Sequence, residues 1–194
     1  MNIQKSMISG IFKDISFSQK EITQIESKFE KLTLKKGDTL LNAGKTVNHQ
    51  YFINSGCLRT YFVDNSAKDH IIQFAIKDWW ISDYTAFFTS SKAIMTIDCI
   101  QDASVCRISK VDMESLYIEI PRLETFFRKK MEGAFAGFQK RIIGNLSQST
   151  KEKYSSFIST YPNIEQSVKN YHIASYLGVT TETLSRVRKK LVQK

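Results

Sequence analysis

The spacing of apolar positions divides the chain into three stretches. Over residues 11–29 apolar side chains recur at the period of a helix, and Ser18 and Glu21 are spaced to form a capping box at its start. Over residues 32–109 the period falls toward two, which is typical of strands. From Val111 onward the period is helical again. This order predicts an α+β protein with a β-rich part followed by helices.

The middle stretch predicts several short strands. Residues 51–53, 58–63 and 70–74 are strand candidates, and residues 98–109 are expected to add a last pair of strands. Turn residues separate them, as at Asn54-Ser55-Gly56. Regular turn signals between short strands favour a β-sandwich or jelly roll.

The stretch after residue 109 predicts a short helix and then a long one. Residues 111–118 form the short helix, and Pro121 suits the first turn of a helix over residues 122–146. The long helix is apolar on two sides, so we expect one side to pack on the strands and the other on a second copy of the chain. The alternative is burial of both sides within one protomer. The residues expected at the dimer contact are Phe127, Met131, Ala134, Phe138 and Ile142.

The last part of the chain has the pattern of a helix-turn-helix. Residues 170–177 predict a short helix, and Gly178 can take the positive φ that a sharp exit requires. Thr180 or Thr181 can cap a second helix. In that helix an apolar stripe faces a core, while the opposite face is polar and basic. The alternative is an ordinary pair of antiparallel helices with a solvated basic face.

Charge strengthens the interpretation as a nucleic-acid binder. The net charge is +9, yet residues 1–120 are neutral, residues 121–148 carry +4 and residues 149–194 carry +5. A basic surface binds the phosphates of double-stranded DNA by releasing condensed counterions. A basic face kept only for solubility is the alternative, and its coincidence with the predicted helix-turn-helix weighs against it.

Composition limits the class of protein. With 42% apolar residues the chain is globular, and no apolar run approaches the roughly 20 residues that span a bilayer. The three cysteines lack metal-binding spacing, which favours reduced thiols in a cytoplasmic protein. Cys99 and Cys106 lie in neighbouring strand candidates and are either a redox pair or, more commonly, buried free thiols.

Several motifs give the chain a family resemblance. Lys36-Gly37-Asp38, Gly44, the run from Tyr51 to Gly56 and Arg59 resemble the cyclic-nucleotide-binding β-roll. Together with the helix-turn-helix they resemble the Crp/Fnr family of bacterial transcription regulators over nearly the whole chain, in a branch common in Bacteroidetes-type bacteria. The resemblance implies a sensor domain over residues 1–120, a dimerisation helix over residues 121–148 and a DNA-binding domain over residues 149–194. The strands that usually flank the helix-turn-helix have little room here, so we expect a truncated wing.

The resemblance also implies how a homodimer would contact DNA. Thr181, Glu182 and Arg186 occupy the positions that face base edges, and an activator of this family also contacts RNA polymerase. Backbone contacts are expected from further polar and basic residues, namely Lys169, Asn170, Tyr171, Ser185, Arg188, Lys189 and Lys190.

The effector cassette of the family is altered in this chain. Cyclic-AMP-binding members place Gly-Glu and then Arg-Ser about ten residues later, where the arginine holds the cyclic phosphate. Here Ser82 and Asp83 stand for the first pair and no arginine stands at the second, so cyclic AMP is not expected to bind tightly. Another small-molecule effector remains open. The candidate pocket residues are Trp80, Ser82, Asp83, Tyr84, Lys92, Phe138 and Gln139.

Other chemistries have weaker support. A metal-dependent enzyme on a cupin-like β-roll needs histidine and carboxylate ligands on facing strands, and His49 and His70 are too few. The cysteine pattern does not favour an iron–sulfur cluster. We therefore expect neither enzymatic activity nor a metal site, and the remaining rival is a small-molecule-binding module with weak or no DNA binding.

Overall fold

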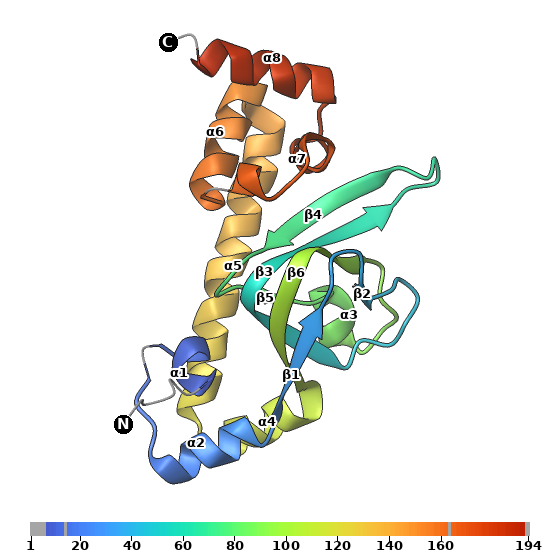
Figure 1. The fold of residues 1–194 in the computed structure, drawn as a ribbon. Coiled ribbons are helices and arrows are strands. Elements are labelled where there is room, and N and C mark those ends of the chain that lie inside the picture. The colour runs from blue at the N-terminus through green and yellow to red at the C-terminus, as the bar shows by residue number, and fades with distance from the viewer. Residues whose placement is uncertain (1–6, 14, 163, 193–194) are drawn as a thin grey trace.

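Six strands pair into one sheet that curls into a roll, with helices before and after it (Figure 1). The computed structural model describes residues 7–13, 15–162 and 164–192. The α+β prediction is confirmed. The strands are β1 Phe29–Leu34, β2 Thr39–Leu41, β3 His49–Val63, β4 Asp69–Ala75, β5 Trp80–Ile81 and β6 Thr96–Ser109.

The helices lie at both ends of the chain, with one between β5 and β6. They are α1 Met7–Ile11, α2 Gln19–Glu26, α3 Tyr84–Thr89, α4 Lys110–Glu119, α5 Arg122–Ser147, α6 Thr150–Thr160, the 3₁₀ helix η1 Ile164–Gln166, α7 Asn170–Leu177 and α8 Thr181–Val192. The prediction of a short helix followed by one long helix after residue 109 is confirmed by α4 and α5.

The helix expected over residues 11–29 is wrong in extent. α1 ends at Ile11, and α2 begins after Ser18, whose side chain and that of Glu21 form the predicted capping box. Phe29 belongs to β1, where it pairs with Ile108 of β6. The apolar spacing could not separate a helix end from the strand that follows it, because Phe29 is buried in either case.

The sheet is antiparallel, in the order β1-β6-β3-β4, with β2 on β6 and β5 on β3. Two expectations about it were wrong, because residues 51–63 and residues 98–109 each lie in one long strand, not in two. The register of β3 against β6 shifts around Ser55 and Cys57. Gly56 sits there with φ of 88°, and a Cβ on it would lie 2.3 Å from the carbonyl oxygen of Asp102. The turn signal therefore marks a bulge inside β3.

Two apolar cores lie on opposite faces of the sheet. The first fills the inside of the roll and continues into α1, α4 and the start of α5. The second joins Cys57, Ile71 and Phe74 of the sheet to the buried faces of α6, α7 and α8. The last three helices, with η1, are called the head below. The head therefore packs directly on the sheet and does not hang free from α5.

α5 runs along one side of the molecule, past the sheet and up to the head (Figure 1), and most of its side chains are exposed. Leu123 and Phe127 near its start are buried in the first core. Farther along, apolar side chains are open to solvent, with Phe135 65% and Leu146 84% exposed. A helix with this much exposed apolar surface leaves a face for a partner.

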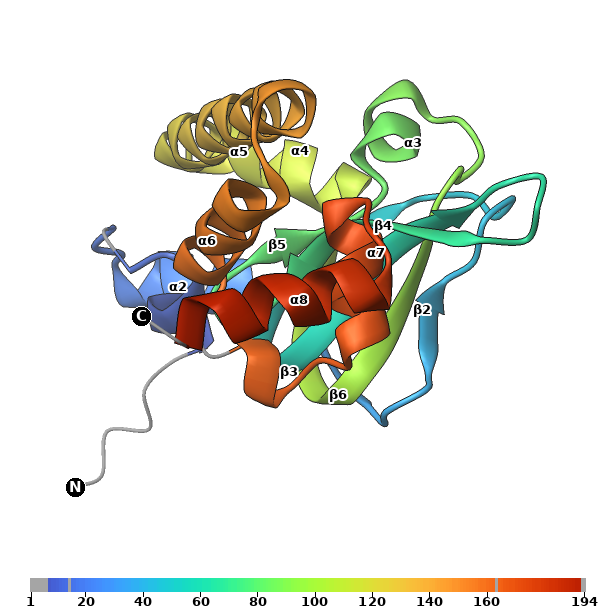
Figure 2. The same cartoon turned by 90° about the horizontal axis from the view of Figure 1, so that it is seen from above.

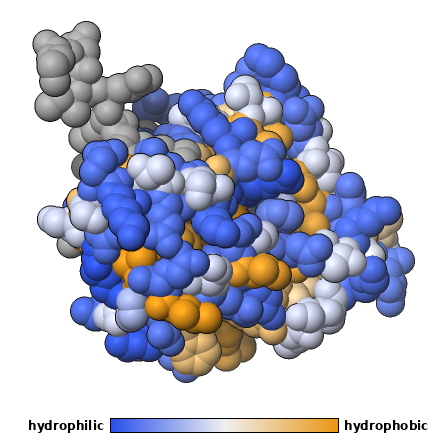
Figure 3. Space-filling model, turned by 90° about the horizontal axis from the view of Figure 1, so that it is seen from below, coloured by the Kyte–Doolittle hydropathy of each residue, from blue (hydrophilic) through white to orange (hydrophobic). Residues whose placement is uncertain are grey.

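The end of the molecule that carries α2 and α4 is mostly hydrophilic. Figure 3 views this end, where apolar side chains appear in small separate patches between polar ones. Val111 and Ile118 of α4 are among the exposed apolar residues. In the part of the chain that the structure describes, no helix has the combined length and apolarity needed to cross a bilayer.

The cysteines Cys57, Cys99 and Cys106 are buried and are not joined to one another by a disulfide. Burial raises the pKa of Cys57 to about 12 and that of Cys99 to about 11. The thiol forms are therefore strongly favoured at neutral pH, which makes both side chains poor nucleophiles.

Candidate nucleic-acid interface

The predicted helix-turn-helix is confirmed in its geometry. α7 ends at Gly178, which has φ of 68°, and the next residue, Val179, donates its N–H to Ala174 O at 3.0 Å. Thr180 then caps α8, because its Oγ1 accepts the N–H of Thr183 at 3.2 Å. Leu184 is 0% exposed and fixes α8 against the second core.

The polar face of α8 is open to solvent. Figure 2 views the molecule from above, and no other element lies over α8 in this view. Figure 1 shows α8 at the end remote from α2 and α4. Arg186 donates to Thr183 Oγ1 at 3.2 Å, a contact that leaves its remaining N–H groups for a ligand. The exposed polar side chains on this helix are Glu182, Ser185, Arg186, Lys189 and Lys190.

The first turn of α8 favours a charged carboxylate. The pKa of Glu182 lies below its ordinary value because its own backbone N–H and the hydroxyls of Thr180 and Thr181 donate to it. The positive end of the helix dipole acts in the same direction. Glu182 is therefore ionised at neutral pH and can accept a hydrogen bond from a base edge.

Arg188 and Asn170 do not lie free on the DNA-facing surface. The Arg188 guanidinium donates to Tyr154 Oη at 2.9 Å, to Asn170 Oδ1 and to Glu165. The expected phosphate contact by Arg188 is therefore corrected, because its donors hold α8 against α6 and η1. Lys169 is exposed and lies 5.8 Å from the Tyr171 ring, which is itself half exposed.

Arg141 of α5 ties the head to the sheet. Its guanidinium donates to Ile71 O at 3.2 Å, to Ile72 O, and to Tyr176 O of α7 at 3.1 Å. It also stacks over the Tyr176 ring at 3.9 Å. Ser175 adds a second tie, since its hydroxyl accepts the Ile71 N–H at 3.2 Å. Three elements far apart in the sequence thus meet at one side chain.

A second polar contact joins β3 to α7. Arg59 forms a bidentate pair with Asp98 at 2.8 Å, contacts Asp69 at 3.1 Å and donates to His172 Nδ1 at 3.1 Å. Burial, followed by the charge of Arg59, lowers the pKa of His172 to about 4. His172 is therefore neutral at pH 7 and able to accept. Sequence reasoning found neither this contact nor Arg141, because no periodic signal marks a pairing between distant segments.

The expected effector residues Ser82 and Asp83 have structural roles. Asp83 is 0% exposed, and its carboxylate accepts the backbone N–H groups of Ala86, Ile94 and Met95 at 3.1, 2.8 and 3.0 Å. Ser82 donates to the carbonyl of His49 at 2.9 Å. The amides at the start of α3 and in the facing loop are thus already occupied by a carboxylate of the chain itself, which corrects the expectation for both residues.

Of the other expected pocket residues, Trp80, Tyr84 and Phe138 border one cavity beside α5, and Lys92 and Gln139 do not. Trp80 is buried and packs its ring on Phe127, so it belongs to the core. Lys92 donates to Thr46 Oγ1 at 2.8 Å on the surface. Tyr84 lies with Phe138 along a cavity beside α5, while Gln139 is exposed. The structure therefore does not bring the seven residues together into one cyclic-nucleotide site.

Comparison with known proteins agrees with this architecture. Residues 31–119 match the cyclic nucleotide-binding domain family. The fumarate and nitrate reduction regulatory protein of Salmonella typhi is 23% identical over 201 residues, covering 96% of this chain and 79% of the relative.

Two solved structures share the fold. FixK2 from Bradyrhizobium japonicum matches with a TM-score of 0.73 at 15% identity, over 85% of each chain. A putative transcriptional regulator of the Crp/Fnr family from Eubacterium rectale matches with a TM-score of 0.69 at 17% identity, over 91% of this chain and 85% of the other. The matched domain, the similarity along nearly the whole sequence and the shared arrangement of roll, long helix and helix-turn-helix make this chain similar in sequence and fold to regulators of the Crp/Fnr family.

Proposed function

We propose that the protein is a homodimeric transcription regulator that binds specific sites on double-stranded DNA through α8. The observation that carries the proposal is the uncovered polar face of α8 beyond a correctly formed glycine turn (Figure 2). The regulators among its relatives support the same role and favour a non-enzymatic protein that works in the cytoplasm.

Within this proposal the residues of α8 divide into two groups. Arg186 reads guanine through a bidentate contact, and Glu182 accepts from cytosine N4, with Thr181 beside them. Ser185, Lys189 and Lys190 contact phosphates, which position the protein without specifying sequence. Lys169 and Tyr171 at the start of α7 extend the backbone contacts.

The exposed ridge of α5 supports a homodimer. Phe127 is only 5% exposed inside its own protomer, so it is not available for the expected dimer contact. Met131, Ala134 and Phe138 all border the cavity beside α5, and of these Ala134 adds the least apolar surface to a contact. The remaining apolar side chains recur every three to four residues on one side, which is the spacing of a helix–helix seam. The ridge consists of Met131, Phe135, Phe138, Ile142 and Leu146.

Two protomers joined along this ridge would place two copies of α8 at the same end of the molecule. Half-sites would then lie about one helical turn of DNA apart. A contact with RNA polymerase belongs to the proposal if the protein is an activator, and no described residue is assigned to it.

Cyclic AMP is not a tight ligand in this proposal. Asp83 already satisfies three backbone amides, and its negative charge would repel a phosphate brought to the same place. Calorimetric binding of cyclic AMP at micromolar affinity would contradict this statement.

The test of the proposed function is selection of bound sequences from a random pool of duplexes by the purified full chain. We expect a near-palindromic motif with two half-sites, and a steep loss of affinity as salt is raised. Selection of no motif, together with salt-insensitive binding, would instead favour a small-molecule-binding module without DNA function.

A further inference from the structure

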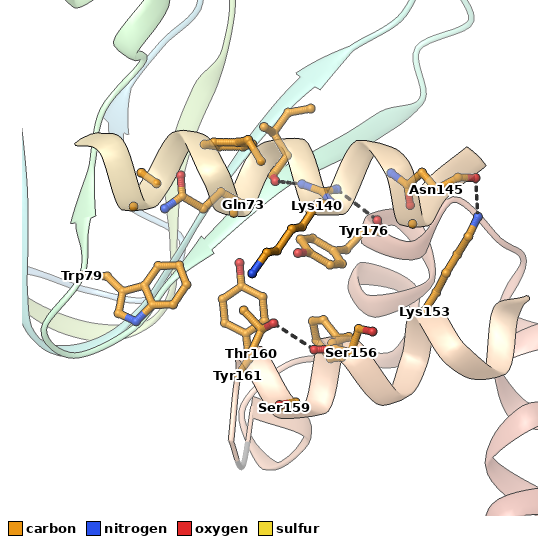
Figure 4. A pocket seen from close by; sticks show the side chains of 18 of the residues that line it. Gln73, Trp79, Lys140, Asn145, Lys153, Ser156, Ser159, Thr160, Tyr161 and Tyr176 are labelled. Carbon is orange, nitrogen blue, oxygen red and sulfur yellow. Dashed lines mark hydrogen bonds between the residues drawn. The ribbon is translucent and has the colours of Figure 1, made fainter. Parts of the chain in front are cut away.

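A cavity of about 1050 Å³ lies between α5, the segment joining β4 to β5, and the head. Figure 4 shows α5 along one side and α6 along the other. The cavity is separate from the polar face of α8. Asp83 does not line it, so it also differs from the closed amide cluster at the start of α3. Nothing in the proposed DNA contacts uses this space.

One wall of the cavity is aromatic. The rings of Trp79 and Tyr161 lie 5.1 Å apart and are inclined by 31°. The Tyr176 ring stands nearly perpendicular to that of Tyr161, at 5.7 Å. Flat apolar faces of this kind bind planar rings by offset or edge contacts.

On the α5 side, part of the cavity wall is formed by glycines, which leave space where other residues would place side chains. Gly133 and Gly137 lie one helical turn apart and both line the cavity. A Cβ built on either residue would meet no atom within 4 Å. Glycine weakens a helix relative to alanine, and here two glycines keep the middle of a long helix free of bulk on this side.

The charge around the cavity is positive. Its only acidic lining residue is Asp78, among the residues that the structure describes, and Lys13 neutralises it at 2.6 Å. Of the basic lining residues, Arg141 donates to backbone carbonyls and Lys153 donates to Asn145 O at 2.9 Å. Both therefore have protein partners.

The ammonium groups of Lys130 and Lys140 make no hydrogen bond or ion pair with any described residue. That of Lys130 lies over the Phe126 ring at 5.3 Å. The Lys140 side chain instead extends across the opening toward Tyr161 (Figure 4). An ammonium group beside aromatic rings is a suitable partner for an anion that also carries a ring.

We propose that this cavity binds a small planar aromatic anion. Its ring lies against Trp79 and Tyr161, and its carboxylate pairs with Lys140. Because α6 and α7 supply one wall and α5 the other, the ligand contacts the head and the long helix together. Occupancy would therefore stabilise the arrangement of the head seen here, through contacts that depend on both sides.

The test measures binding by calorimetry, on the purified full chain and without DNA. The probe is 2-naphthoate, with uncharged 2-naphthamide as the comparison. We expect one 2-naphthoate per protomer and weaker binding of the amide. Lys140→Gln should weaken 2-naphthoate binding about tenfold, which is typical of losing a hydrogen bond to a charged group, and leave the amide unchanged. Lys129→Gln removes the same charge from an exposed neighbour outside the cavity and should change neither.

Two bulk variants locate the ligand. Gly137→Leu fills the cavity from its floor and should abolish binding, whereas Ala136→Leu adds the same side chain on another side of α5 and should not. Equal affinity in Gly137→Leu and the unaltered chain, equal effects of Lys140→Gln and Lys129→Gln, or no binding at all would each overturn the proposal. Because DNA is absent, these results stand apart from the outcome of the sequence selection.

Discussion

At the scale of single residues, the proposal gives Arg186 and Lys189 different roles: Arg186 reads the base sequence and Lys189 binds the DNA backbone. Both are exposed on α8, yet one carries a planar fork and the other a point charge. Arg186→Ala should cost about 1–3 kcal/mol on the selected site and relax one base position. Lys189→Ala should weaken all duplexes alike and lower the salt slope by about one. Titrations on specific and random DNA would reject the assignment if both variants behaved identically.

Asp83 allows a test of whether its carboxylate is structural. Asp83→Ala leaves three buried backbone N–H groups without their acceptor, so it should destabilise the fold by about 2–4 kcal/mol. Asp83→Asn keeps one acceptor oxygen and should lose less. Urea unfolding measures both. An unchanged midpoint in Asp83→Ala would show that the carboxylate is not structural.

His172 predicts how stability depends on pH. Its pKa falls from 6.5 to about 4 on folding, so the unfolded chain binds more protons between these values. Stability is complete above about pH 6.5 and should decrease as the pH is lowered toward 4. The charged groups around it are Arg59, Asp69, Asp98 and Lys169.

His172→Gln should flatten this dependence, since an amide oxygen can accept from Arg59 without titrating. Urea unfolding at pH 7.5 and pH 5.0 measures the difference. His49 also has a lowered pKa, through burial and the charge of Arg107, so His49→Gln is the matched comparison. The interpretation is wrong if the loss between the two pH values is the same in His172→Gln as in the unaltered chain.

At the scale of elements, the proposed dimer contact lies on α5. A charge placed on its apolar ridge would be buried without a partner, so Ile142→Glu should weaken self-association by about 2 kcal/mol or more, roughly thirtyfold in Kd. Ala136→Glu puts the same charge on another side and should leave association unchanged. Sedimentation equilibrium distinguishes them. Dimers of equal strength in both variants would move the interface away from the ridge.

The helices and strands also show which structural features could be predicted from local sequence. Caps and turns act over three or four residues, so Ser18, Gly178 and Thr180 could be placed from local spacing alone. The signal at Gly56 was interpreted as a turn between two strands, whereas it marks a bulge within β3. The two could not be distinguished, because a glycine with positive φ suits both. Which side of α5 is buried could not be read from a helix that is apolar on two sides.

At the scale of the whole molecule, tertiary pairing is what sequence reasoning could not supply. The family resemblance predicted the roll, the long helix and the helix-turn-helix. It did not predict that the head packs on the sheet through Arg141 and Arg59, since these contacts join residues more than 30 positions apart. It also assigned Asp83 to a ligand, whereas the structure closes the same amides internally.

The carbonyls bound by Arg141 have one further consequence. A short linker at Gln148 and Ser149 would by itself let the last three helices swivel. The Arg141 guanidinium binds β4 on one side and the end of α7 on the other. A rotation of the head must therefore break these hydrogen bonds or move β4 with it. Movement of the roll and movement of the head are therefore coupled, and the strength of the coupling depends on the side chain at position 141.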